Sequence, residues 1–295
     1  MRPTILLIGK NGQVGWELTR TLAPLSELAA VDYPEIDLAD GASIRKWVRD
    51  VAPRVVVNAA AYTAVDKAEA EADLCQMING VAPGILAEEG KRLGALLVHY
   101  STDYVFDGTK TEPYVEEDAP NPLSVYGRSK LAGDRAIQAL DCAHVIFRLC
   151  WVYGARGHNF LRTMMRLACE RETLRVVRDQ IGCPTWSRMI AEATALALQQ
   201  VLAVRDLSAF QGTYHLAASG HTSWHGFAEG IVARMAPAVK KCRMVEAIST
   251  PEYPTPAKRP AWSVLGCGKL KRTLGLQLPH WQESLQRMME ELSGD

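Results

Sequence analysis

The chain has 295 residues, of which 48% are hydrophobic and 22% are charged. This is the composition of a folded globular protein and excludes disordered, collagen-like and coiled-coil architectures. The 33 Lys and Arg residues balance the 33 Asp and Glu residues, so no net positive charge draws the chain to nucleic acid or to an anionic membrane. No apolar run reaches the ~18–20 residues that a membrane-spanning helix requires.

The seven cysteines are odd in number and include no CxxC pair, which argues against a disulfide framework and against a thiolate zinc site. A reducing cytoplasm fits this usage. The apolar stretch at the start is shorter than that of a secretion signal, and no small-residue cleavage site follows it. We therefore expect residues 1–8 to contribute a first β-strand.

Short apolar runs alternate with segments of helical period through the first half, which is typical of βαβ units around a parallel sheet covered on both faces. We expect strands at Thr4–Ile8, Leu28–Asp32, Arg54–Asn58, Ala95–Tyr100 and Val145–Cys150, and helices at Gln13–Leu22, Ala42–Val51, Ala72–Leu93 and Val125–Leu140. A helix at Arg188–Val204 and a strand at Thr213–Ala217 follow. The fold class is α/β, a Rossmann-like doubly wound parallel sheet.

The alternation fades after about Trp151, and four prolines between residues 251 and 260 exclude a regular helix there. We expect a dinucleotide-binding domain at residues 1–152, to which residues 186–217 return. Residues 153–185 and 218–295 are expected to form a smaller C-terminal lobe that binds the substrate.

A glycine-rich turn, Gly9-Lys10-Asn11-Gly12-Gln13-Val14-Gly15, follows the first expected strand and opens the first expected helix. In this context the glycines permit a tight turn, a close approach of backbone to a pyrophosphate, and close packing of helix on strand. The unpaired N–H groups at the helix start attract an anion. The GxxGxxG spacing is typical of short-chain dehydrogenases, so we expect a nicotinamide dinucleotide here.

Asp32 ends the second expected strand, where an acid accepts hydrogen bonds from the adenosine ribose of NADH and repels a 2′-phosphate. Lys10 offsets that repulsion, so both NADPH and NADH stay open as cofactors. Asp37 and Leu38 are expected at the adenine side. After the third strand, Ala59-Ala60-Ala61-Tyr62-Thr63 either lets the backbone pass close to the ribose or is plain packing.

Tyr126 and Lys130 are four residues apart in an expected helix, which places both on one face. A phenol with a pKa near ~10 is a weak acid, and a neighbouring ammonium favours its ionised form. We expect Lys130 to bring the pKa of Tyr126 toward working pH, so that Tyr126 is a general acid. Lys130 is also expected to hydrogen-bond the nicotinamide ribose.

Ser101, Thr102 and Asp103 follow the fourth strand, at the carboxyl edge where doubly wound sheets bind ligands. Thr102 is the best hydroxyl to polarise a substrate carbonyl, Ser101 is expected to be structural, and Asp103 is a candidate to accept from a sugar hydroxyl. A capping turn built from these residue types is the alternative.

The chain resembles a known family through motifs that span nearly its whole length. These are GKNGQVGWEL, VNAAAYTAVDKAE, HYSTDYVFDG, YGRSKLAGD, FRLCWVYG, DQIGCPT and YPTPAKRP. They look like the dTDP-4-dehydrorhamnose reductase family of extended short-chain dehydrogenases. The resemblance implies reduction of the C4 ketone of dTDP-4-dehydro-L-rhamnose by NADPH or NADH, the last step in making dTDP-L-rhamnose. A homodimer is a further expectation.

Carried over by position, the resemblance implies site residues of three kinds. Thr102, Tyr126 and Lys130 match the catalytic set, and Thr102, Asp103 and Trp151 match positions that face the substrate. The cofactor contacts match Gly12, Gln13, Val14, Asp32, Asp37, Leu38, Ala61, Tyr62 and Thr63, which join Gly9 and Gly15 of the glycine turn. A tryptophan at a strand end is equally a core residue. Arg259 either contacts the diphosphate or forms a surface ion pair.

Some members of the family hold Mg²⁺ at a dimer interface with glutamates, and Glu17 and Glu291 are plausible matches. The third position corresponds to Arg188, whose guanidinium cannot ligate Mg²⁺. The sequence therefore argues against a metal here. His221 and His225 lie four apart, but residues 219–223 indicate a helix entrance rather than a zinc site.

Two other functions stay open from the sequence. A nucleotide-sugar epimerase or dehydratase shares the glycine turn and the YxxxK pair. A regulatory subunit that binds NADP without catalysis would also keep this fold.

Overall fold

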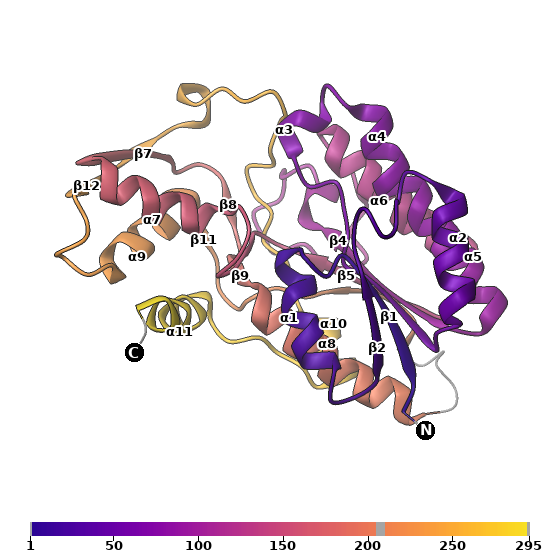
Figure 1. Cartoon of the computed structure of the whole chain (residues 1–295). Coiled ribbons are helices and arrows are strands. Elements are labelled where there is room, and N and C mark those ends of the chain that lie inside the picture. The colour runs from indigo at the N-terminus through magenta and orange to yellow at the C-terminus, as the bar shows by residue number, and fades with distance from the viewer. Residues whose placement is uncertain (1, 205–209, 294–295) are drawn as a thin grey trace.

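The computed structural model describes residues 2–204 and 210–293, and the parts of the predicted ranges that fall on Met1, residues 205–209 and residues 294–295 lie outside the described residues. A six-stranded parallel sheet forms the centre, in the order β10-β5-β4-β3-β1-β2 (Figure 1). Its strands are β1 (Thr4–Ile8), β2 (Glu27–Val31), β3 (Val55–Asn58), β4 (Leu96–Thr102), β5 (His144–Leu149) and β10 (Gly212–His215). All six predicted strands are confirmed, and the order reverses at β1, which lies between β2 and β3.

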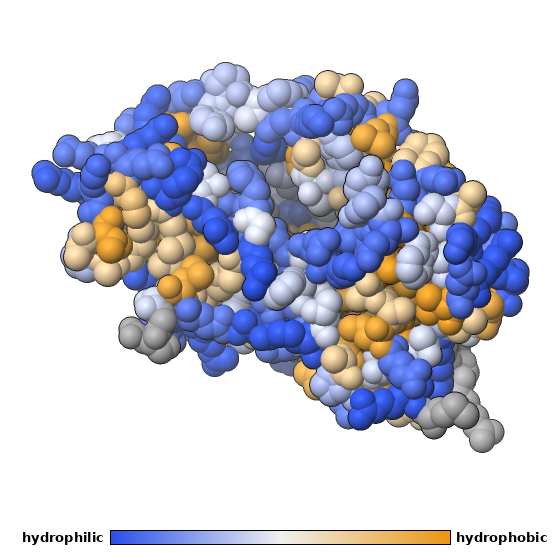
Figure 2. Space-filling model, in the orientation of Figure 1, coloured by the Kyte–Doolittle hydropathy of each residue, from blue (hydrophilic) through white to orange (hydrophobic). Residues whose placement is uncertain are grey.

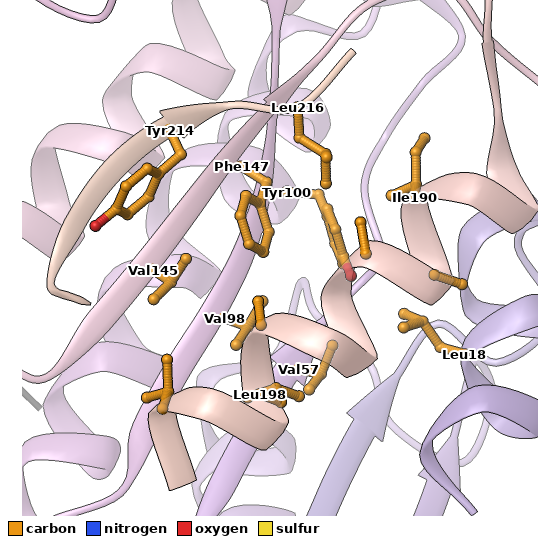
Figure 3. Packing of buried hydrophobic residues seen from close by; sticks show 14 of the residues in the cluster. Leu18, Val57, Val98, Tyr100, Val145, Phe147, Ile190, Leu198, Tyr214 and Leu216 are labelled. Carbon is orange, nitrogen blue, oxygen red and sulfur yellow. The ribbon is translucent and has the colours of Figure 1, made fainter. Parts of the chain in front are cut away.

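The sheet is covered on both faces, and its inner strands are apolar at most positions without strict alternation, as such burial requires. Ile5 and Leu7 of β1 point toward α1 (Gln13–Leu22) and α8 (Ser187–Ala203), whereas Leu6 and Ile8 point toward the opposite cluster. That opposite cluster includes side chains of α2 (Gly41–Val51), α5 (Ala82–Leu93) and α6 (Val125–Ala139). Figure 3 shows the first cluster, with side chains of the sheet lying against α8.

One predicted helix is wrong as a continuous element. Residues 72–93 form α4 (Ala72–Gln76), a π-helical turn (Met77–Val81) and then α5. Pro83 has no N–H to donate to the carbonyl of Asn79, four residues earlier, and its ring would crowd that carbonyl in a regular helix. The wider turn resolves this conflict, and it carries the buried Asn79 side chain toward the backbone of Tyr62.

A second group of elements lies to the left of the sheet in Figure 1, whereas α2 and α5 lie to its right. It contains α7 (Phe160–Glu170), α9 (Trp224–Arg234), α11 (Trp281–Ser293) and the parallel strands β7 (Thr173–Val177) and β12 (Met244–Ile248). These elements share a separate hydrophobic cluster. The expected helix entrance at residues 219–223 is confirmed, since Ser223 caps α9 by accepting from the N–H of Gly226.

The remaining elements are short. They are α3 (Val65–Ala68), a 3₁₀ turn (Asp103–Val105), β6 (Val152–Tyr153), β8 (Ile181–Gly182), β9 (Thr185–Trp186), β11 (Thr222–Ser223), a 3₁₀ turn (Thr250–Glu252) and α10 (Gly268–Leu274). As expected, residues 251–260 form no α-helix. Within residues 2–204 and 210–293, no helix is both long enough and apolar enough to cross a membrane.

Candidate active site

The glycine turn joins β1 to α1 at the point where the strand order reverses, which is where open α/β sheets bind ligands. Gly9 has a φ of +92°, and a Cβ there would lie 2.6 Å from the backbone nitrogen of Ala60. A Cβ on Gly15 would lie 1.9 Å from the carbonyl oxygen of Gly9. Both positions therefore require glycine to pack the turn against β3 and α1.

Gly12 differs, because a Cβ there would lie 3.4 Å from its nearest neighbour, the carbonyl oxygen of Gly9. The protein's own packing tolerates a side chain at this position, so the glycine is better explained by the approach of a ligand. Gly12 is also the N-cap of α1, and the first turn of that helix has no acidic residue and no side-chain cap. The backbone N–H groups of this first turn suit the pyrophosphate of a dinucleotide.

Asp32 lies directly after β2, beside the glycine turn. Its carboxylate accepts from the backbone N–H groups of Asn11, at 2.8 Å, and of Tyr33, at 2.8 Å. Lys10 donates to Glu35 at 2.6 Å, so its charge faces this glutamate, and the pKa of Glu35 is lowered by that hydrogen bond. The sequence did not reveal this pair, and it qualifies the expectation that Lys10 offsets the charge of Asp32.

The other expected cofactor residues lie along the same edge of the sheet. Asp37 accepts from the N–H of Ala39, and the Leu38 side chain is buried in the core cluster beside α2. The loop of Ala61, Tyr62 and Thr63 follows β3, and Asn79 holds it by bonds to both the N–H and the carbonyl of Tyr62. Val14 packs on the hydrophobic core.

Gln13 links the glycine turn to the second group of elements. Its side-chain oxygen accepts from the Asn159 side chain at 2.9 Å, and Asn159 is the N-cap of α7. The same Asn159 amide donates to the carbonyl of Gly154. This hydrogen bond joins the start of α1 to the start of α7, which belongs to the second group of elements.

The Tyr126 side chain is brought to the sheet edge by a close helix contact. Ser124 caps α6 by accepting from the N–H of Gly127. A Cβ on Gly127 would lie 2.2 Å from the carbonyl oxygen of Tyr104, so only glycine lets α6 approach the turn that follows β4. The rings of Tyr104 and Tyr126 consequently meet edge to face, with centroids 5.8 Å apart.

The phenol of Tyr126 lies near the hydroxyl of Thr102. Burial raises the pKa of Tyr126 above its ordinary value, and the nearby Thr102 hydroxyl acts in the opposite direction. Thr102 itself is buried, accepts from the N–H of Tyr104 and donates to Asp103 at 3.1 Å. The structure thus brings together the phenol and the hydroxyl that the sequence singled out.

The expectation that Lys130 lowers the pKa of Tyr126 is wrong for the described structure. The Lys130 ammonium turns to the sheet, where it donates to the carbonyl of Tyr100 at 2.6 Å and lies 3.2 Å from Nε2 of His99. The pKa of Tyr126 is raised, mainly by burial, so the described structure shows no net lowering of it. Helical spacing placed the two residues on one face, but the buried carbonyl of Tyr100 determines where the ammonium points.

Asp103 lies deeper than the sequence implied. Its carboxylate is 2% exposed and accepts from the Cys150 thiol at 3.2 Å as well as from Thr102. Burial raises its pKa to about 6. Asp103 therefore acts first on Thr102, whose hydroxyl it orients. Ser101 is structural as expected, since it donates to the buried Asp134.

Trp151 has a φ of +44° and stacks face to face on Trp224, with centroids 3.5 Å apart. It is 9% exposed, and Gly182 leaves the room that its ring occupies. The tryptophan therefore joins the strand end to α9. Most of its surface is used in packing, and only an edge remains for a ligand.

Arg259 extends from the proline-rich tail to α3. Its guanidinium forms a bidentate ion pair with Asp66, at 3.1 and 2.7 Å. Burial lowers the pKa of Arg259, but the ion pair with Asp66 and the nearby phenol of Tyr104 raise it above its ordinary value. The ion pair is confirmed, and it lies beside the Tyr104–Tyr126 contact. Figure 2 shows a hollow, with mainly hydrophilic residues around it, in this part of the surface.

Glu17 and Glu291, the plausible matches to the family's metal-binding glutamates, are joined by an arginine. Arg188 lies between them and contacts both Glu17 and Glu291, while Arg20 also pairs with Glu17 at 3.0 Å. A guanidinium supplies the positive charge that a metal would otherwise provide, and it has no lone pair for a cation. No group of three or more His, Cys, Asp or Glu side chains suited to a metal occurs within the described ranges.

The comparisons with known proteins agree with this geometry. A family model described as the RmlD substrate binding domain matches residues 1–293. Proteins named dTDP-4-dehydrorhamnose reductase from Burkholderia thailandensis and Escherichia coli K12 are 48% and 45% identical, over 98% of this chain and 98% and 97% of their own lengths.

Solved structures show the same relationship. A dTDP-4-dehydrorhamnose reductase from Bacillus anthracis in complex with NADP superposes with a TM-score of 0.89 at 35% identity, covering 99% of this chain and 100% of that one. A UDP-glucose 4-epimerase complex with NAD from Thermus thermophilus has a TM-score of 0.81 at 20% identity, with 99% of each chain covered, and so shares the fold. The chain belongs to the dTDP-4-dehydrorhamnose reductase family.

Proposed function

We propose that this chain reduces the C4 ketone of dTDP-4-dehydro-L-rhamnose to dTDP-L-rhamnose with NADPH or NADH, the last step in making that activated sugar. The observation that carries the proposal is the placement of the Tyr126 phenol, in the first turn of α6 and against the Tyr104 ring, near the Thr102 hydroxyl at the end of β4. Both groups lie along the same sheet edge as the glycine turn. Such an edge suits the meeting of a nicotinamide and a carbonyl.

When bound, the nicotinamide supplies a hydride to C4 of the sugar. Tyr126 gives its proton to the C4 oxygen, so that the ketone becomes an alcohol. Because burial raises its pKa, Tyr126 keeps that proton across the working pH range until the oxygen develops negative charge. Thr102 turns its hydroxyl from Asp103 to the same oxygen and polarises the carbonyl.

Lys130 holds the nicotinamide ribose by hydrogen bonds and adds positive charge beside the reacting oxygen. We assign cofactor binding to residues 1–152 with residues 186–217, and sugar binding to residues 153–185 and 218–295. Gly9, Gly12 and Gly15 hold the pyrophosphate end, and Arg259 contacts the diphosphate of the nucleotide sugar at the junction. The hydrogen bond between Gln13 and Asn159 joins one residue of each region, so the two regions contact each other beside the glycine turn.

We further propose that the chain works in the cytoplasm as a homodimer. All seven cysteines lie within the described residues and carry free thiols, which suits a reducing compartment. Sedimentation equilibrium tests the assembly: a homodimer has twice the 32.5 kDa mass of the chain. A single-chain mass would contradict it.

The function is tested by supplying the purified chain with NADPH and the dTDP ketosugar. We expect one NADPH to be oxidised for each dTDP-L-rhamnose formed, and dialysis to remove the cofactor. A cofactor that stays bound while sugars interconvert without net oxidation would instead indicate an epimerase or a dehydratase. Cofactor binding without turnover by the chain alone would indicate a regulatory subunit.

A further inference from the structure

A chain of buried polar side chains leads across the sheet to Lys130. The Lys130 Nζ lies 3.2 Å from Nε2 of His99, and Nδ1 of the same ring lies 3.1 Å from the side-chain nitrogen of Asn58. Asn58 and His99 are register partners on β3 and β4. His99 is fully buried, and Asn58 and Lys130 are each 1% exposed. Neither His99 nor Asn58 was given a role by the sequence.

The protonation state of Lys130 determines which atoms donate and which accept in the hydrogen bonds that link Lys130, His99 and Asn58. An ammonium has three donors and no lone pair, so Nε2 of His99 must accept from it and the ring proton must be on Nδ1. That proton needs an acceptor, and the Asn58 amide is the group beside it. The Asn58 oxygen has no hydrogen-bond partner among the described residues. Turning the amide by 180° places this oxygen against Nδ1.

The opposite arrangement requires an uncharged Lys130. If the Asn58 nitrogen donates to Nδ1, the ring proton is on Nε2 and the lysine must offer a lone pair. The orphaned Asn58 oxygen then remains buried without a partner, which is costly. The arrangement in which Lys130 carries its charge is therefore the one that gives the Asn58 oxygen a partner.

We propose that His99 is a positioning residue of the reductase site, whose Nε2 holds Lys130 as an oriented ammonium, with Asn58 fixing the ring tautomer. This inference rests on the proposed function, because Lys130 is the group assumed to bind the nicotinamide ribose. His99 itself touches no reacting atom. Its effect reaches the reaction only through Lys130.

The groups around Lys130 leave its hydrogen bond to His99 to decide whether the ammonium keeps its proton. Burial lowers the pKa of Lys130 to about 8, while Asp134 on the same helix and Cys75 on α4 raise it. Asp134 is itself partly neutralised, since Arg148 of β5 lies 3.4 Å away. Burial and the charge of Lys130 hold the pKa of His99 well below its ordinary value, so the ring stays a neutral acceptor. The ammonium is thus close to losing its proton at mildly basic pH.

Two substitutions at one position separate the acceptor from the bulk of the ring. His99→Leu removes the acceptor and keeps an apolar side chain. His99→Gln keeps an oxygen at about the reach of Nε2. The dissociation constant of NADH, measured by its fluorescence between pH 6 and 10, reports the ionisation of Lys130 without any sugar. Lys130→Met is the control in which this pH dependence should disappear.

We expect NADH binding to the natural chain to weaken above about pH 8. A fall of one unit in the pKa of Lys130 in His99→Leu corresponds to about fivefold less ammonium at pH 8, whereas His99→Gln should keep the natural profile. If His99→Leu does not fold, His99→Asn replaces it, because its amide is too short to reach Lys130. An unchanged profile in the variant without the acceptor, or equal shifts in it and in His99→Gln, would overturn the proposal.

The outcome is separable from the proposed function. Binding of NADH with the expected profile but no consumption of the ketosugar would contradict the reductase assignment and support the role of His99. Normal ketosugar reduction, together with a pH profile of NADH binding that His99→Leu does not change, would support the reductase assignment and contradict the role of His99.

Discussion

Arg259 and Asp66 form a bidentate ion pair that connects the proline-rich tail to α3, beside the tyrosine pair of the site. The guanidinium holds the pKa of Asp66 below its ordinary value. Such a pair has two possible uses here: it anchors the tail, or it keeps an arginine ready for a diphosphate.

These two uses predict different results for Asp66→Asn and Arg259→Gln. If Arg259 contacts the diphosphate, Arg259→Gln should raise the KM for the nucleotide sugar by about 10–100-fold, as expected for a lost bond to a charged group. Asp66→Asn should change this KM much less, because the arginine remains. Equal effects of both substitutions would leave Arg259 with only the anchoring role. Steady-state kinetics with varied sugar measure this.

Lys10 and Glu35 are expected to set the choice between NADPH and NADH. Glu35→Gln frees the ammonium of Lys10 from its 2.6 Å partner, so it should favour the 2′-phosphate of NADPH by a few-fold. Lys10→Met should shift the preference toward NADH. The ratio of kcat/KM for the two cofactors measures the effect at low salt, since exposed charges are screened. A ratio unchanged by either substitution would remove Lys10 from this role.

The Glu17–Arg188–Glu291 cluster predicts a protein that is independent of Mg²⁺. Activity and thermal unfolding of the natural chain should be the same in EDTA and in millimolar Mg²⁺. Arg188→Gln should lower the free energy of unfolding by about 2 kcal/mol, because Glu17 is almost buried and keeps only Arg20.

A matched substitution tests the same cluster from the other direction. Arg188→Glu places a third carboxylate between the two glutamates, so it should destabilise the fold more than Arg188→Gln does, and Mg²⁺ should restore part of the loss. Loss of activity of the natural chain in EDTA would contradict the account of this cluster.

Gly127 is predicted to control the position of Tyr126. Gly127→Ala places a Cβ against the carbonyl of Tyr104, so α6 must move. We expect kcat to fall at least tenfold, since small misplacements near a reacting group are costly. Gly90→Ala in α5 is the control, because its Cβ would have an ordinary contact at 3.6 Å. It should keep full activity and match or exceed the natural stability.

The sheet was predictable because the burial of strands on both faces leaves a signal in the sequence itself. Residues such as Ile5, Leu6 and Leu7 are apolar without alternation, which only a strand covered on both faces explains. The break at residues 77–81 was not predictable in this way. Pro83 marks a disruption inside the expected helix, but over five residues the α- and π-helical periods are nearly alike, so the form of the turn could not be predicted.

The features of the site also divide into those that local sequence predicts and those that depend on tertiary structure. Glycine spacing and the YxxxK pair are local, so Gly12, Tyr126 and Lys130 could be predicted as site residues from the sequence. The direction of the Lys130 ammonium could not be predicted, because its partners, His99 and Tyr100, are about 30 residues away in the sequence. The signal that was available was a histidine inside an otherwise apolar strand. The pairing of Lys10 with Glu35 depended equally on tertiary structure.

The proposed reduction depends on Tyr126 as the proton donor, and Tyr126→Phe removes only the hydroxyl that would give this proton. Stopped-flow measurement of NADPH oxidation with the dTDP ketosugar should show a loss of at least about 100-fold in the rate of reduction. The dissociation constant of NADPH should stay within about twofold, because the ring keeps its packing on Tyr104. A rate of reduction close to that of the natural chain would contradict the account.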